Sequence, residues 1–115
     1  MSKFGSRART GAVGTGASVT QNKRVVHNES KTEPMDYIPQ EGETASVGLS
    51  VSFGFSHDFG KQKGDASAWV TLPCRPDAES IQETAQRCRQ IAIAEAQSTM
   101  DELIDTYYPE GFTNG

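Results

Sequence analysis

The sequence predicts an α+β fold with a disordered basic N-terminal segment, a β-hairpin and one long amphipathic α-helix. From Ala45 to Phe55, apolar residues at odd positions alternate strictly with Ser or Gly at even positions. This is the pattern of a strand with one buried face. A second alternating run covers residues 66–72. Apolar residues then recur every three or four positions from Ile81 to Tyr107, which is the period of a helix.

Residues 1–44 form the basic N-terminal segment, which we expect to be largely disordered. Gly, Ser, Thr, Ala, Asn and Gln dominate it, and residues 2–18 show neither a strand nor a helix period. Such a composition buries too little apolar surface to offset the loss of chain entropy on folding. Val25 and Val26, within residues 22–27, are the exception, because they fit a short edge strand.

The predicted hairpin joins strands at about residues 44–56 and 66–72. The link His57–Asp65 holds two glycines, two aspartates and two lysines, as is typical of an exposed loop. Alternation places Trp69 on the polar face of the hairpin. Two interpretations stay open for it: its ring covers a glycine of the sheet, or it is a contact residue on which a nucleic-acid base stacks.

Asp77 is the predicted N-cap of the helix, and Pro109 ends it. A helix of some thirty residues is about 45 Å long, whereas a seven-residue strand spans about 23 Å. The apolar stripe therefore outreaches the hairpin, and we expect a second copy of the chain to cover the excess. The alternative is that the N-terminal segment supplies a third strand, at residues 19–27, and that the overhanging helix fits a different protein. The predicted dimer is a four-stranded antiparallel sheet covered by helices. The ββα domain spans residues 45–109, followed by a flexible tail at 110–115. The expected interface residues are Ile91, Met100, Leu103, Ile104 and Tyr107.

Charge is divided unevenly along the chain. Residues 1–34 hold six basic and two acidic residues, a net charge of +4, and residues 35–115 hold five basic and thirteen acidic residues, a net charge of −8. We see neither an apolar run of membrane-spanning length nor a secretory signal, so we expect a cytoplasmic protein without a membrane partner.

Catalytic and cofactor signatures are not recognisable in the sequence, so we expect no enzyme activity and no cofactor. The two histidines have no acid partner that the sequence reveals, and the serines have no adjacent base. Cys74, Cys88, His57 and His27 are ligand types that zinc accepts, but they lack the short paired spacing of zinc motifs, so we expect no metal site.

Residues 45–109 resemble small phage-encoded proteins of unassigned function that combine a β-hairpin with an acidic amphipathic helix. The resemblance rests on Val47-Gly-Leu-Ser-Val-Ser-Phe53, on Trp69-Val-Thr-Leu-Pro73 and on the helix that follows. It implies an accessory protein near replication or host defence, acting in the host cytoplasm. It assigns no functional residue.

Two functional hypotheses follow. In the first, the chain is a dimeric accessory protein that binds single-stranded nucleic acid, with basic side chains on phosphates and one aromatic ring on a base. The residues expected to contact nucleic acid are Arg7, Arg9, Lys23, Arg24, Lys61, Lys63 and Trp69. In the second, it is a protein-interaction or inhibitor module whose acidic helix face binds a basic partner protein.

Overall fold

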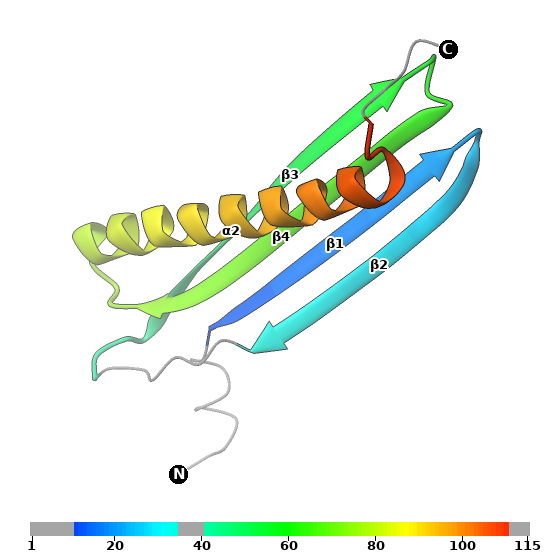
Figure 1. The fold of residues 1–115 in the computed structure, drawn as a ribbon. Helices are drawn as coiled ribbons and strands as arrows, with labels where there is room; N and C mark the ends of the chain where they lie inside the picture. Colours follow the sequence, from blue (N-terminus) through cyan, green and yellow to red (C-terminus); the bar gives the residue numbers. More distant parts are fainter. Residues whose placement is uncertain (1–10, 35–40, 111–115) are drawn as a thin grey trace.

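A computed structural model describes residues 11–34 and 41–110 of the chain. It shows a four-stranded antiparallel sheet with one α-helix on one face (Figure 1). The strands are β1 (Ala12–Gln21), β2 (Arg24–Pro34), β3 (Ala45–His57) and β4 (Gln62–Cys74), and the helix is α2 (Ala78–Tyr107). The sheet order is β2-β1-β4-β3, so two hairpins lie side by side and meet where β1 pairs with β4.

The expectation of a largely disordered N-terminal segment is wrong for residues 12–34, which form the hairpin of β1 and β2. β1 pairs with β4 along its whole length, from Ala12 opposite Thr71 to Gln21 opposite Gln62. This long-range pairing supplies hydrogen bonds and burial that the composition of residues 12–34 does not predict. Residues 1–10 and 111–115 lie outside the described residues, and so do the predictions for Arg7, for Arg9 and for most of the tail.

The second hairpin is confirmed, and its strands are longer than expected. β3 and β4 have thirteen residues each, and only residues 58–61 connect them. Lys63 and Asp65, which we expected in a loop, belong to β4, because the alternating pattern continues to the turn. The edge strand expected around Val25 and Val26 is also present, as part of β2.

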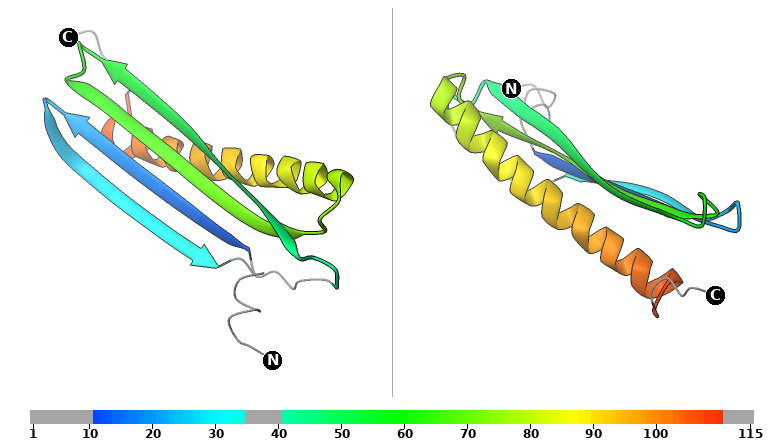
Figure 2. Two further views of the ribbon diagram at one scale, coloured as in Figure 1. Left: turned by 180° about the vertical axis from the view of Figure 1, so that it is seen from behind. Right: turned by 90° about the horizontal axis from the view of Figure 1, so that it is seen from above.

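The helix begins where the sequence predicts. The Asp77 carboxylate accepts hydrogen bonds from the Ser80 backbone N–H at 2.8 Å and from the Ser80 hydroxyl at 2.9 Å. These bonds lower the pKa of Asp77. At the other end, the Tyr108 N–H donates to the Ile104 carbonyl at 2.7 Å. The helix crosses the strands obliquely on one face of the sheet (Figure 2).

Two groups of buried residues hold the helix on the sheet. The first joins Ala68, Val70 and Leu72 of β4 to Cys88, Ala92 and Ala96 of α2. The second joins Ala17, Val19 and Ala66 to Leu103. The helix side chains in the first group are small, which brings the helix backbone close to the sheet.

The apolar stripe of the helix is covered largely by the sheet of its own chain. The expectation that the stripe needs a second copy to cover it is therefore corrected. Leu103, expected in a dimer interface, is 5% exposed in the core of the single chain. A thirteen-residue strand is about 43 Å long, which matches a thirty-residue helix of about 45 Å. The four-stranded sheet expected from two chains is built by one.

Candidate functional site

The turns of the two hairpins lie side by side at one end of the sheet (Figure 1). The Lys23 backbone N–H donates to the Lys61 carbonyl at 3.3 Å. Beside this contact, the Gln62 side-chain N–H donates to the Asn22 side-chain oxygen at 3.0 Å. The contacts follow from the register, since Gln21 at the end of β1 stands opposite Gln62 at the start of β4.

Both turns use left-handed backbone conformations. Asn22 and Lys23 have φ of 52° and 68°, as in a two-residue type I′ hairpin turn. Asp58 and Phe59 both have φ of 55°. A bulky side chain in this region is unfavourable, and such strain gathers at functional sites. Phe59 has this backbone conformation although its side chain is 105% exposed, so its ring lies in solvent.

We name the residues Lys23, Arg24, Phe59, Lys61 and Lys63 the tip patch. Its four basic side chains are all exposed, and only one acidic residue, Asp58, lies in the two turns with them. Within the described part of the chain, none of these four cations forms an ion pair. The end of the sheet is therefore basic although the whole chain has a net charge of −4.

Trp69 lies on the open face, which is the sheet face away from α2. It stands opposite Gly14 of β1 and Ser50 of β3. Its ring lies over Gly14, because a Cβ at that glycine would be 2.0 Å from the indole Nε1. The first interpretation of Trp69 is thus confirmed. The residue is still 38% exposed, so the ring is also available to a ligand.

The sequence-predicted contact residues fall into two places. Lys23, Arg24, Lys61 and Lys63 come together at the tips, whereas Trp69 does not join them. Lys63 and Trp69 share the open face and are six residues apart on β4, which is about 20 Å. Phe59 was not predicted as a contact residue. The sequence placed it in the exposed loop His57–Asp65, and an aromatic residue in such a loop was the signal that could have identified it.

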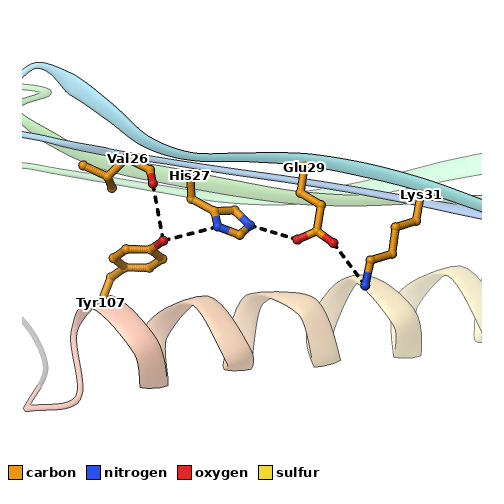
Figure 3. A network of polar contacts seen from close by, with 5 residues as sticks. All are labelled: Val26, His27, Glu29, Lys31 and Tyr107. Atoms are coloured by element: carbon orange, nitrogen blue, oxygen red, sulfur yellow. Dashed lines mark hydrogen bonds and ion pairs between the residues drawn. The ribbon is translucent and has the colours of Figure 1, made fainter.

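A polar network links the last turn of the helix to β2 (Figure 3). The Tyr107 hydroxyl donates to the Val26 carbonyl at 3.4 Å and lies 3.2 Å from His27 Nδ1. His27 Nε2 is 3.2 Å from a Glu29 carboxylate oxygen, and Lys31 Nζ is 3.0 Å from the other. The hydrogen bond and positive charge of Lys31 are the main causes of a lowered pKa at Glu29.

This network gives His27 the acid partner that the sequence did not reveal. Residues two apart on a strand share a face, so Glu29 was the candidate once residues 24–34 were recognised as a strand. The network borders a groove of about 280 Å³ between β2 and α2. In this network the His27 imidazole contacts both the Tyr107 hydroxyl and the Glu29 carboxylate. We assign the network the role of fixing the C-terminal end of the helix to the sheet.

Both cysteines are buried thiols. The Cys88 thiol donates weakly to the Val47 carbonyl at 3.7 Å, and burial raises its pKa. Among residues 11–34 and 41–110, no group of three or more His, Cys, Asp or Glu side chains is placed to hold a metal ion.

The residues expected in an oligomer interface do not form a separate surface. Ile91 packs against the first buried group, while Met100 and Tyr107 pack against the second. Ile104 is half-buried, and Leu103 is in the core.

No helix in the described part of the chain has the length and apolar composition that crossing a bilayer requires. No protein-family model, curated protein or solved structure matches this chain. The resemblance to small phage-encoded proteins therefore stays a prediction.

Proposed function

We propose that this chain is a non-enzymatic protein that binds single-stranded nucleic acid through the tip patch. The observation that carries the proposal is the contact between the two hairpin turns, marked by the hydrogen bond from the Lys23 N–H to the Lys61 carbonyl. It gathers cations from segments about forty residues apart in the sequence. Four exposed cations without ion pairs suit a run of phosphates, with Asp58 in the turns and Asp65 further along the open face as the nearby carboxylates.

Phe59 and Trp69 supply the preference for single strands. An exposed aromatic ring stacks on a base only when the base is not already stacked in a duplex. Phe59 stands beside the cations, and Trp69 lies further along the open face. Between them the open face carries small side chains such as Ser67 and Ser52, which allow a strand to lie close to the sheet. Arg7 and Arg9 add phosphate contacts in this proposal.

The proposal includes a homodimer that acts as an accessory protein in the cytoplasm, of the host if the chain is phage-encoded. Two copies carry two tip patches, and linked patches bind one strand more tightly than separate ones when the strand reaches both.

Fluorescence anisotropy with a labelled single-stranded oligonucleotide tests the proposal. We expect the double variant K61Q/K63Q to bind about tenfold or more weakly than the original chain at low salt, because two phosphate contacts are lost. The matched control is R87Q/R89Q, which removes the same charge from exposed positions on α2, where Arg87 lines a pocket with Leu72 and Cys74 at the end of β4 away from the tips.

Two results would contradict the proposal. One is no binding by the original chain at low salt. The other is an equal loss in both double variants, which would mean that only net charge matters. Binding of a basic protein that requires helix carboxylates such as Glu95 and Glu102 would instead favour the inhibitor hypothesis.

A further inference from the structure

The two edges of the sheet differ sharply in chemistry. β2, at one edge, contains four charged residues among eleven and ends in Pro34. β3, at the other edge, has thirteen residues without a single Asp, Glu, Lys or Arg. Charges and proline are what proteins use to prevent an edge strand from pairing with another chain. β2 has this protection, and β3 lacks it.

β3 also leaves apolar surface uncovered. Val47, Leu49, Val51 and Phe53 pack against the first buried group but are only partly buried. Thr99 and Glu102 line the groove between β2 and α2, and Glu95 lines a second groove beside it. These three residues therefore lie on the side of α2 towards β2. Helical spacing therefore places the half-buried Ile93 and Ile104 on the opposite side of α2, the side towards β3. The apolar strip beside this edge thus consists of side chains from β3 and side chains from α2.

We propose that β3 pairs antiparallel with β3 of a second copy of this chain, about a two-fold axis at Val51. This inference concerns the dimer within the proposed function and names its surface. In this register Leu49 stands opposite Phe53 of the second copy, and Ser50 opposite its Ser52. Residues directly opposite each other in an antiparallel pair point to the same side. All odd positions of both strands then lie on the helix side, and all even positions lie on the open face.

A second copy is the occupant that the edge chemistry favours. The two-fold axis places both helices on the same face, so the apolar strips of the two copies become continuous. The resulting sheet has eight strands and exposes only the charged β2 at each end. Pairing through β3 therefore uses the unprotected edge of each chain and leaves no further unprotected edge for growth.

The test measures the mass of the full chain by light scattering, without nucleic acid. The variants S50K and S52K each add a lysine at an exposed position on the open face. In the double variant the lysines stand opposite lysines of the second copy, because residue 50 faces residue 52. We expect the original chain to have the mass of two copies at about 50 μM, and the double variant to dissociate roughly tenfold or more readily. The control S30K places one such lysine on the exposed β2, and we expect this variant to keep the mass of two copies.

The single substitution V51C adds a geometric test. Residues at the two-fold axis of an antiparallel pair have Cα atoms about 4.5–5.5 Å apart, within the range of a disulfide. We expect oxidation of V51C to give a covalent dimer. A single-copy mass for the original chain, or a dimer equally resistant to S50K/S52K and to S30K, would overturn the inference. Oligonucleotide binding by a monomer would contradict the pairing through β3 but would still support binding at the tip patch. The two proposals can therefore be contradicted independently.

Discussion

At the scale of single residues, two members of the tip patch have backbone conformations that favour glycine. Lys23 has φ of 68° and Phe59 has φ of 55°. A residue with a Cβ costs about 1–2 kcal/mol in the left-handed region relative to the right-handed one. Neither residue gains burial in exchange, because both are exposed. The fold thus holds a cation and an aromatic ring where a glycine would be more stable, which fits the proposed binding role of the tip patch.

The variant K23G tests this trade between stability and binding. We expect it to raise the free energy of unfolding by about 1 kcal/mol, because glycine fits a type I′ turn. We also expect it to weaken oligonucleotide binding, because a cation is lost. Urea denaturation and anisotropy on the same samples measure the two effects. G60A is the control: its φ of 83° makes alanine unfavourable, so stability falls while every charge remains. If K23G bound as well as the original chain, Lys23 would have no part in the site.

Gly14 is required by the position of Trp69. The Cβ of an alanine there would lie 2.0 Å from the indole Nε1, so the ring must move. We expect G14A to lower the free energy of unfolding by about 1–3 kcal/mol and to shift the tryptophan fluorescence, since the chain has one tryptophan. G54A is the matched control on the same face, where the nearest atom is 3.5 Å from the new Cβ. Equal effects of the two variants would contradict the placement of the ring over Gly14.

At the scale of elements, the packing of α2 depends on small residues facing the sheet. Ala92 is 0% exposed between the helix and β4. We expect A92L to lower the free energy of unfolding by about 1–3 kcal/mol, because the larger side chain pushes the helix away from the sheet. The control A94L adds the same atoms at an exposed position and should change stability little. Urea denaturation compares them, and similar losses would show that the packed face is misassigned.

The helix cap makes stability depend on pH. Hydrogen bonds from Ser80 lower the pKa of Asp77 from its usual 3.8. A carboxyl whose pKa is lowered by folding stabilises the native state above its unfolded pKa, and this stabilisation is lost as the pH falls through the folded pKa. We expect the melting temperature of the original chain to exceed that of D77N at about pH 6 and to approach it near pH 2. A difference that is independent of pH would mean that the charge of Asp77 does not contribute.

The sequence predicts β3, β4 and α2 well because each has a strong local pattern. Val47 to Phe55 alternate without exception, and Asp77 marks the start of the helix. It does not predict β1, and it predicts only the part of β2 around Val25 and Val26, because the order of these strands comes from pairing over long distances. Gly14 and Gly16 have little intrinsic strand preference and are held by neighbours such as Trp69 and Ser30.

At the scale of the whole molecule, the same limit explains the candidate site. Basic residues such as Lys23 and Lys61 were identified from charge alone. Their proximity follows from the pairing of β1 with β4, which no local pattern contains. Leu103 was placed in an interface for the same reason: with only two strands expected, its burial had no explanation within one chain. Once four strands are present, the unprotected β3 edge takes the place of the helix as the expected surface for a second copy.

The dependence of oligonucleotide binding on salt tests the central claim most directly. A tip patch that engages phosphates with four cations predicts that the logarithm of the binding constant falls against the logarithm of salt concentration with a slope of about −2.8 per chain. Residues 1–10 would make the slope steeper. A binding constant that does not change with salt would contradict an electrostatic site at the hairpin tips.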